Sequence, residues 1–519
     1  MSRKGPLNWR LFLLGICLLC LIVSSCQKKP EENVLVIGLE GNPTNLDPRL
    51  ATDAYSVRID SIIFNGLMKL DPRANLLPNL TEKYENPTPT TYRFYLKKGV
   101  KFHNGRELTA PDVKYTFETI RDPSFKSPHL NSFEKLKAIK IVDEYTIEFE
   151  LQEPFAPFLT SLVVGIIPRD IAEQEGEKFG QHPMGTGPFK FRRWVPGSRI
   201  ELDANPDYYE GLPRLDAVVF KVVPNDTTRV FELKKGSVHL LQNSVPPDSM
   251  DILEEDPGIE IIRKDGINYS YIGFNLEDKI LSNKKVRQAI AYALNREEII
   301  EYLLKGLAVP ATGLLAPSNW AYEGEVARYD YRPETSRKLL DEAGYLDPDG
   351  EGPKSRFKLS YRTSTNRLRQ RIGEVLARQL REVGIELETR SYEWGTFFAD
   401  IKSGNFQLYT LTWVGITEPD IYYYVFHSSS VPPQGANRGR YKNEEIDRLL
   451  EEGRRCLEQD SRKEIYSRIQ KILAEELPYI SLWYSTNVVA QTKGIQGFEI
   501  YPGGEFTSLK EVYFTQEQP

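Results

Sequence analysis

Residues 91–113, TYRFYLKKGVKFHNGRELTAPDV, carry the main evidence for the fold. The stretch begins with apolar residues at every second position, which is typical of a half-buried β-strand. A turn around His103 follows, and we expect a structural role for this histidine in preference to a ligand-binding one. Thr109 can then cap a helix that carries Pro111 in its first turn. The stretch therefore predicts a strand, a turn and a helix in succession.

Similar patterns extend on both sides of this stretch. The apolar run 34–39 feeds a turn-rich stretch, and α/β proteins tend to hold ligands at such carboxyl ends of strands. No internal repeat and no low-complexity linker divides the chain, so we expect mixed α/β lobes without a flexible joint. The expected strands are 34–39, 147–151 and 479–484, and the expected helices are 54–68, 282–305, 368–383, 443–457 and 461–476.

One of these helices carries several basic residues. Arginines interleave with the apolar positions of 368–383, and we interpret them as a solvated surface, with a basic interaction face as the alternative. These residues are Arg369, Arg371, Arg378 and Arg381.

The amino-terminal residues are typical of a targeting segment. Three basic residues precede Leu11–Val23, an apolar run of 13 residues, which is shorter than the roughly 20 residues of a membrane-spanning helix. The run ends in Val-Ser-Ser-Cys, which resembles a lipobox with Cys26 as the lipidated residue. We therefore expect a signal peptide at 1–25 and a lipidated tether at 26–33; an uncleaved anchor is the alternative.

Composition and charge exclude several classes of protein. The chain has 519 residues with 40% hydrophobic and 27% charged residues, which is globular composition. Its formal net charge is −6 and no long run of Lys or Arg is present, so nucleic acid is not an expected partner. If residues 1–25 are removed and Cys26 is lipidated, Cys456 is the one cysteine that keeps a free thiol. A single free thiol excludes an intramolecular disulfide and a cysteine-based metal site.

Motifs for catalysis and cofactor binding are missing from the sequence. It contains no H-E-x-x-H, G-x-S-x-G or P-loop pattern, and its five histidines are dispersed. Gly185-Thr186-Gly187-Pro188 starts like a dinucleotide-binding turn, but the proline removes an amide, so we interpret it as a tight turn. We therefore expect no enzyme activity, no cofactor and no metal; an exported hydrolase with a dispersed site is the remote alternative.

Four blocks of sequence, taken together, resemble the family 5 extracellular solute-binding proteins, which include the dipeptide- and oligopeptide-binding lipoproteins of ABC importers. The resemblance covers essentially the whole mature chain, in the same order. The blocks are TNLDP (44–48) with IFNGL (63–67), the stretch 92–113, GTGPF (185–189) with NPDYYEG (205–211), and VRQAIAYALNR (286–296).

The resemblance implies an α/β, two-lobed fold like that of periplasmic binding proteins (type II, the large cluster with an extra subdomain in lobe I). Two chain crossings would form the hinge, and ligand would stabilise the closed state by contacting both lobes. The implied division is a lobe I core of 34–50, 181–268 and 488–519, an inserted subdomain of 51–180, and a lobe II of 269–487.

The same resemblance implies a function. The protein would be an exported, membrane-anchored lipoprotein, periplasmic or on the cell surface, and a monomer. It would capture a peptide or a peptide-like solute between its lobes and deliver it to the permease subunits of an ABC transporter.

Site residues follow from the resemblance position by position. Trp394, in the segment Glu-Trp-Gly-Thr-Phe, and Trp413 are expected to line the ligand pocket. Tyr269, Tyr271 and Asn275 lie on the expected crossing strand, which borders the ligand. Core packing is the alternative for each aromatic residue, and we expect only one of the two tyrosines to face the ligand.

The chain also departs from the family pattern. Peptide binders of this family usually carry Trp-x-x-Asp, whose aspartate pairs with the α-ammonium of the ligand, and here Ile416 occupies that position. An enclosed ammonium without a counter-ion costs several kcal/mol. Either Glu418 or Asp420 takes over this role, or the cargo is not a free-amine peptide; an oligosaccharide, an opine or a nickel chelate is then the alternative.

Overall fold

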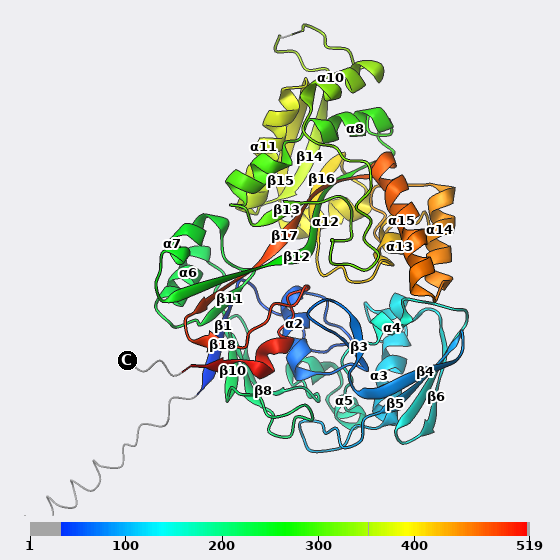
Figure 1. The fold of residues 1–519 in the computed structure, drawn as a ribbon, viewed down its shortest axis with the longest axis vertical. Helices are drawn as coiled ribbons and strands as arrows, with labels where there is room; N and C mark the ends of the chain where they lie inside the picture. Colours follow the sequence, from blue (N-terminus) through cyan, green and yellow to red (C-terminus); the bar gives the residue numbers. More distant parts are fainter. Residues whose placement is uncertain (1–32, 351, 516–519) are drawn as a thin grey trace, which may run out of the picture.

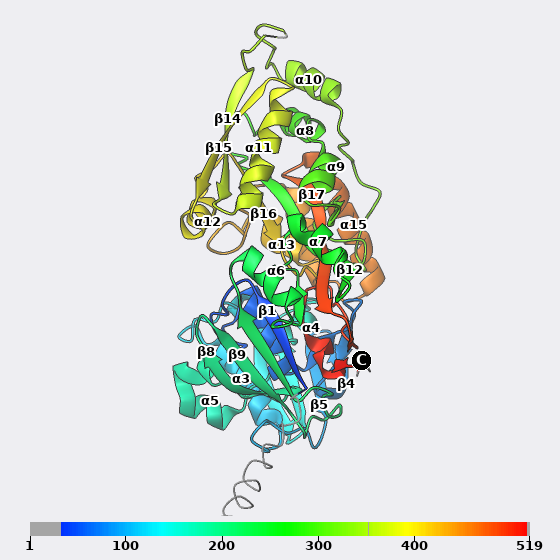
Figure 2. The ribbon, with the colours of Figure 1, turned by 90° about the vertical axis from the view of Figure 1, so that its left-hand side faces the viewer.

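The computed structural model describes residues 33–350 and 352–515 and consists of two lobes (Figure 1). The predicted signal peptide, Cys26 and the tether up to residue 32 lie outside the described residues. Two long antiparallel strands, β12 (Ile259–Phe274) and β17 (Tyr479–Thr492), connect the lobes (Figure 2). The structure thus has the mixed α/β, two-lobed organisation that the sequence predicts, and the proposed residue boundaries of the lobes remain a prediction.

One eleven-stranded sheet runs through both lobes in the order β15-β14-β16-β12-β17-β11-β1-β10-β9-β8, with β13 paired to β17. Lobe I contributes β1 (Val34–Leu39), β8 (Phe189–Val195), β9 (Arg199–Ala204), β10 (Ala217–Val222) and β11 (Leu240–Gln242), with α2 (Ala54–Ile63), α5 (Arg169–Glu175), α6 (Asp226–Lys234) and α7 (Met250–Glu254). Short pairs complete it: β2 (Met68–Leu70) with β3 (Leu76–Pro78), and β18 (Ile495–Gln496) with β19 (Tyr513–Phe514).

The inserted subdomain has a sheet of its own in the order β4-β5-β7-β6. Helix α3 packs on this sheet, and phenylalanines from the helix and the strands form a continuous core between them. The elements are β4 (Thr81–Thr88), β5 (Thr91–Leu96), α3 (Ala110–Arg121), β6 (Leu136–Asp143), β7 (Thr146–Leu151) and α4 (Phe158–Ser161).

In lobe II helices cover both faces of the main sheet. Successive residues of a strand point to opposite faces, so Ile272 packs with α8 and α11 while Tyr271 packs with α13 to α15. The strands are β13 (Ala308–Pro310), β14 (Phe357–Ser364), β15 (Ile385–Tyr392) and β16 (Leu408–Trp413). The helices are α8 (Lys284–Tyr292), α9 (Arg296–Glu298), α10 (Pro333–Glu342), α11 (Arg367–Arg381), α12 (Trp394–Ser403), α13 (Ile421–Phe426), α14 (Glu444–Arg455) and α15 (Gln459–Glu476).

Residues 91–113 form the predicted strand, turn and helix. Strand β5 alternates between buried and half-buried residues, and Thr109 caps α3 in a capping box with Asp112. His103 lies in the turn between them, where its Nε2 is 3.1 Å from the carbonyl oxygen of Gly187 and its Nδ1 accepts a hydrogen bond from the Gly185 amide. The structural role of this histidine is confirmed, and the glycine-rich stretch is a packed loop before β8.

Two predicted helices differ from the structure. The helix predicted at 282–305 is interrupted after Tyr292, and Asn295 starts a new turn by accepting a hydrogen bond from the Glu298 amide. The helix predicted at 54–68 ends at Ile63, because Phe64 is extended and the chain continues toward β2. In both cases the helical spacing of apolar residues continues past the residue at which the helix ends, because local hydrogen bonds end the helix and the spacing does not reflect them.

The strand predicted at 479–484 is too short, because β17 continues to Thr492 as it crosses between the lobes. The other helix and strand predictions agree within a few residues. Helix α11 ends at Arg381, and Gly384 follows with a positive φ of 83°, as expected for a glycine that stops a helix. Among residues 33–350 and 352–515 no helix has both the length and the apolar character that a membrane crossing requires.

Candidate ligand-binding site

The carboxyl ends of three strands in each lobe point toward the junction between the lobes. Strand β16 is antiparallel to β12 and ends at the lobe junction, where Trp413 pairs with Tyr269; β14 and β15 run parallel to it. In lobe I, β11 is antiparallel to β17 and ends toward the same junction, and β1 and β10 are parallel to β11. The loops after these six strands form what we call the interlobe face, which is where open α/β sheets place their ligands.

The lobes contact each other on both sides of the interlobe face. At the end of α14, Arg455 Nε lies 3.2 Å from a carboxylate oxygen of Glu153 in the inserted subdomain. On the side of α11, Arg371 Nη1 lies 3.0 Å from Asp248 Oδ2 of lobe I. The lobes therefore touch on both sides of the face, and Figure 1 shows the lower end of α14 above the inserted subdomain.

Trp413 ends β16 on this face and is only partly buried. Its ring stacks on Tyr271 at 6.5 Å with an interplanar angle of 10°, and its edge meets the exposed Tyr424 of α13. The indole Nε1 is buried and has no hydrogen-bond partner among the described residues. Trp413 thus combines an aromatic surface with an unused donor, and its predicted place in a ligand pocket remains a prediction.

Tyr269 and Tyr271 lie in the lobe II core. They are 1% and 0% exposed, and their rings stack on each other at 5.7 Å. The hydroxyl of Tyr269 lies 2.7 Å from Ser481 Oγ, and that of Tyr271 accepts a hydrogen bond from Arg438. Core packing therefore accounts for both rings in this structure.

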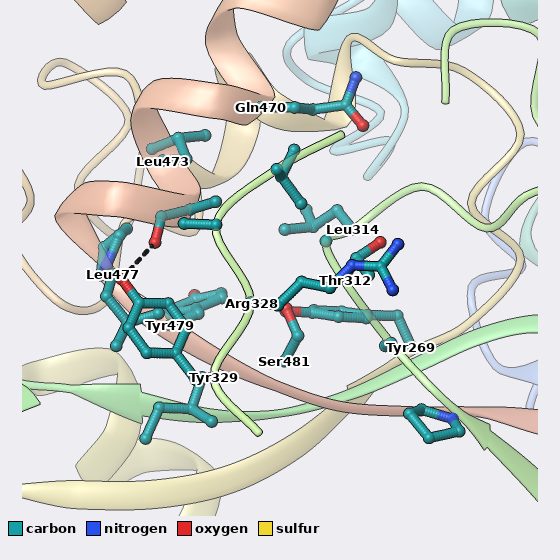
Figure 3. Close-up of a pocket in the computed structure, with 18 of the residues that line it drawn as sticks. Tyr269, Thr312, Leu314, Arg328, Tyr329, Gln470, Leu473, Leu477, Tyr479 and Ser481 are labelled. Carbon is teal, nitrogen blue, oxygen red and sulfur yellow. Dashed lines mark hydrogen bonds between the residues drawn. The ribbon is translucent and has the colours of Figure 1, made fainter. Parts of the chain in front are cut away.

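A cavity of about 250 Å³ lies inside lobe II beside Tyr269 (Figure 3). Tyr479 and Ser481 of β17 form one wall, α15 forms another, and the loop after β13 covers it. Of the seven residues predicted for the ligand site, Tyr269 alone lines this cavity. The predicted residues therefore do not gather around it, and the ligand site proposed below is on the interlobe face.

Trp394 is the first residue of α12 and is 54% exposed. Its ring stacks on Phe398, one turn along the helix, at 5.5 Å and 9°. The side chain of Glu393 caps the helix by accepting hydrogen bonds from the amides of Gly395 and Thr396, which fixes the start of α12 at the end of β15. An exposed, pre-stacked tryptophan on the interlobe face agrees with a role in ligand contact.

Asn275 lies beyond the far end of β12. Its amide nitrogen donates to the carbonyl oxygens of Gly404 and Phe406, and its side-chain oxygen accepts from the Glu277 amide. The residue thus joins loops on the side of lobe II that is remote from the interlobe face, and we assign it a structural role.

The two acids offered as replacements for the missing aspartate are already paired. Glu418 accepts a 2.5 Å hydrogen bond from Arg462, and Asp420 Oδ1 lies 3.0 Å from Arg454 Nε. Burial raises the pKa of Glu418, and it raises the pKa of Asp420 to about 6 despite the nearby arginine. Ile416 is itself 6% exposed and packs in the lobe II core.

Two arginines lie near Trp413 that the sequence prediction did not place at the ligand site. Arg438 is 8% exposed, and its guanidinium carbon lies 4.8 Å from the Trp413 ring centroid and 5.4 Å from that of Phe398. Arg369 of α11 donates a 2.7 Å hydrogen bond to Thr412 on the other face of β16. Arg369 was interpreted as part of a solvated surface; it is partly buried instead, because α11 begins where β14 ends.

Polar groups also end β11 on the lobe I side. Gln242 and Ser244 are buried, and neither side-chain polar group of Gln242 nor the hydroxyl of Ser244 has a partner among the described residues. Asn243 between them has a positive φ of 55° and donates to Asn487 of β17. No sequence pattern distinguished these residues, because the short strand β11 lacks an alternating apolar signal.

The structure offers no ready metal centre in the part of the chain that it describes: residues 33–350 and 352–515 contain no group of three His, Cys, Asp or Glu side chains placed to hold a metal ion. Cys456 is a partly buried free thiol directly after α14.

Two lobes joined by two strands, with strand ends and aromatic side chains on the faces between them, define a two-lobed solute-binding protein. The chain belongs to the bacterial extracellular solute-binding proteins, family 5, whose model matches residues 75–433. It is 31% identical to the oligopeptide-binding protein AppA of Bacillus subtilis over 506 residues, covering 94% of this chain and 92% of that protein. The recognised family and its fold are thus confirmed.

Solved structures show the same similarity. AppA from Bacillus subtilis in complex with a nonapeptide matches with a TM-score of 0.81 and 30% identity. NikZ from Campylobacter jejuni in complex with Ni(L-His) matches with 0.81 and 25%, and AgaA in complex with agropinic acid, from A. tumefacien R10, with 0.79 and 26%. Each match covers 93% of this chain and 99% of the other chain.

Proposed function

We propose that this protein is the substrate-binding lipoprotein of an ABC importer, and that it captures a peptide or peptide-like solute between its lobes and delivers it unchanged to the permease. The observation that carries the proposal is the interlobe face, where the loops after strands of both lobes lie, with Trp413 and Trp394 on the side of lobe II. Relatives named for oligopeptide and dipeptide binding support the peptide class.

Closure around the ligand is the expected mechanism. A neck of two strands lets the lobes rotate without breaking either core, and a solute that contacts both lobes stabilises the closed state in proportion to those contacts. Trp413 and Trp394 supply surface that buries a variable side chain at low conformational cost, while backbone groups at the strand ends supply hydrogen bonds.

Binding without turnover tests the proposal. The purified protein is incubated with a pool of tri- to pentapeptides, separated from unbound material, and its bound fraction identified by mass spectrometry. We expect retained peptides of unchanged mass and a smaller radius of gyration by X-ray scattering. Recovery of cleaved products would support the hydrolase alternative instead, and retention of nothing would contradict the peptide cargo.

A non-peptide cargo is the second candidate, and the pairing of Glu418 and Asp420 favours it. Neither acid is free to hold an α-ammonium, and relatives of the same fold were solved with a nickel–histidine complex and with agropinic acid. Mass spectrometry of whatever co-purifies with the protein distinguishes this candidate from a peptide, because each class has a different composition.

Membrane anchoring through Cys26 is part of the same proposal. Two or more acyl chains hold a protein firmly at a membrane, since each buried CH₂ contributes about 0.8 kcal/mol. We expect metabolic labelling with a fatty-acid analogue to mark the wild-type protein and not Cys26→Ala, with the variant recovered in the soluble fraction. Labelling of Cys26→Ala would contradict the assignment.

A further inference from the structure

The guanidinium of Arg438 has an unused pair of donors. Its Nη1 donates to the Tyr271 hydroxyl at 3.1 Å, whereas its Nε is fully buried without a partner and its Nη2 has no hydrogen-bond partner among the described residues. Nε and Nη2 form the side of the guanidinium that binds a carboxylate with two parallel hydrogen bonds. A buried donor without a hydrogen-bond partner is unfavourable, so an acceptor placed against it is stabilised.

Aromatic rings cover the faces of the Arg438 guanidinium. The aromatic rings of Trp413 and Phe398 lie 4.8 and 5.4 Å from the guanidinium carbon, and Trp394 stacks in turn on Phe398. Stacking covers the face of a planar guanidinium and leaves the N–H groups at its edge free for in-plane partners. The buried, unpartnered Nε1 of Trp413 is a second donor on the same stack.

The charge balance around β16 is positive. Within the described part of the chain, no carboxylate oxygen lies within 4.0 Å of the guanidinium nitrogens of Arg438 or Arg369. The acids of the following loop, Glu418 and Asp420, are paired with arginines of α14 and α15. A buried cation without a counter-ion is costly, and an anionic ligand would supply a counter-charge for it.

We propose that lobe II selects its solute by a carboxylate, held side-on by Arg438 beside the indole N–H of Trp413, and that it requires no free amine. The inference rests on the proposed function and specifies the cargo: an amine-blocked peptide with a free carboxylate, or a small amino acid derivative with additional carboxylates. Both kinds of cargo carry a carboxylate. Its two oxygen atoms can accept hydrogen bonds from the unpartnered donors of Arg438 and Trp413.

Matched ligands test the inference on the unmodified protein. Calorimetry measures the affinity for N-acetyl-Ala-Phe-Ala, which has a carboxylate and no amine, and for Ala-Phe-Ala-amide, which has an amine and no carboxylate. N-(1-carboxyethyl)alanine represents the dicarboxylate source and maltotriose a neutral cargo. We expect the acetylated peptide or the dicarboxylate to bind at least about tenfold more tightly than the amide, as a charge-assisted, two-point contact allows.

Variants then assign the effect to the residue. Arg438→Met should weaken carboxylate binding by about 10- to 100-fold and leave amide binding unchanged. Arg438→Lys should lose less affinity, because lysine keeps the positive charge but lacks the two parallel N–H donors of the guanidinium. Arg448→Gln, on the exposed side of α14, is the matched control and should change affinity less than twofold. The unfolding midpoint of each variant shows whether it is folded.

The outcomes separate the inference from the proposed function. Equal or tighter binding of the amide would overturn the inference and leave a peptide cargo standing. Binding of the dicarboxylate in the absence of peptide binding supports the inference and replaces the peptide by a carboxylated amino acid derivative. Binding of maltotriose alone overturns both, and unchanged carboxylate affinity in a folded Arg438→Met protein overturns the inference by itself.

Discussion

At the scale of single residues, the loop after β16 shows how partners decide roles. Glu418 and Asp420 sit close to Trp413 in sequence, yet each carboxylate is directed to an arginine of another helix. Breaking such a pair leaves a buried charge, so the acids hold the loop in place and are not free to bind a ligand.

Glu418→Gln tests this assignment. The substitution keeps an oxygen acceptor but removes the charge that Arg462 faces, so we expect a loss of about 2 kcal/mol in the free energy of unfolding. The affinity for the free-amine peptide Ala-Phe-Ala should change less than threefold. Urea unfolding measures the change in stability and calorimetry the change in affinity. A tenfold loss of affinity at unchanged stability would show that Glu418 binds the ligand.

His103 makes stability depend on pH. Burial lowers its pKa from 6.5 to about 4, and the neutral ring bridges the Gly187 carbonyl and the Gly185 amide. Because the folded pKa is lower than the unfolded one, the contribution of His103 is fully present above pH 6.5 and is lost as the pH falls through 4. The shift corresponds to roughly 3 kcal/mol, on the basis of 1.36 kcal/mol per pKa unit.

His103→Gln should remove this part of the pH dependence. A glutamine can donate and accept in the same two directions but does not titrate, so the stability of the variant should fall less between pH 7 and pH 4 than that of the wild type. Urea unfolding at several pH values measures the difference, with Lys101→Gln in the same turn as the control. Identical pH profiles for wild type and His103→Gln would contradict the interpretation.

At the scale of elements, the neck depends on an irregularity in β12. The register of β12 against β17 shifts between Lys264 and Asn268, and Gly266 lies within the shift. A Cβ atom at Gly266 would stand 2.1 Å from the carbonyl oxygen of Ser485 in β17, which is closer than any real contact allows. Only glycine therefore permits the two strands to approach at the place where they cross between the lobes.

Gly266→Ala should separate the two strands of the neck. The clash is with backbone, which cannot rotate away, so we expect a loss of about 1–3 kcal/mol in stability and a changed radius of gyration. Gly258→Ala, just before β12, is the control, since its nearest neighbour would be a side-chain oxygen at 3.4 Å. Equal behaviour of the two variants in urea unfolding and X-ray scattering would show that the neck tolerates the added atom.

At the scale of the whole molecule, contacts between the lobes bias the closed state. The Ala156 amide of the inserted subdomain donates a 2.8 Å hydrogen bond to the Arg454 carbonyl at the end of α14, next to the pair of Arg455 and Glu153. These contacts lie beside the interlobe face and not within it, so they add to closure whatever the ligand is.

Arg455→Glu should therefore shift the molecule toward the open state. The substitution replaces an attraction to Glu153 by a repulsion, and for partly exposed charges we expect an effect of about 1 kcal/mol, or roughly fivefold weaker ligand affinity. Scattering should report a larger radius without ligand. Arg448→Glu, on the same helix, carries the same charge change away from lobe I; an equal effect of that variant would exclude a specific contact.

Much of the local structure could be predicted from the amino-acid sequence alone. Alternating apolar residues, capping residues and terminal glycines identified β5, α3 and α11, because these signals act between residues that are neighbours along the chain. The motif blocks also identified the family and, through it, the position of Trp413 on the face between the lobes. The continuous helix predicted at 282–305 was wrong, because apolar spacing does not record the hydrogen bonds that end a helix.

The pairing of charged side chains could be read from the three-dimensional fold and not from the sequence. Arg462 is 44 residues from Glu418, and Arg438 reaches Tyr271 across 167 residues, so neither pairing follows from spacing along the chain. The sequence offered two acids as partners for a ligand, whereas the fold neutralised both and left arginines near Trp413 without a carboxylate. Electrostatic partners depend on distances in space and on burial, and both are set by how the lobes pack, which a one-dimensional pattern does not contain.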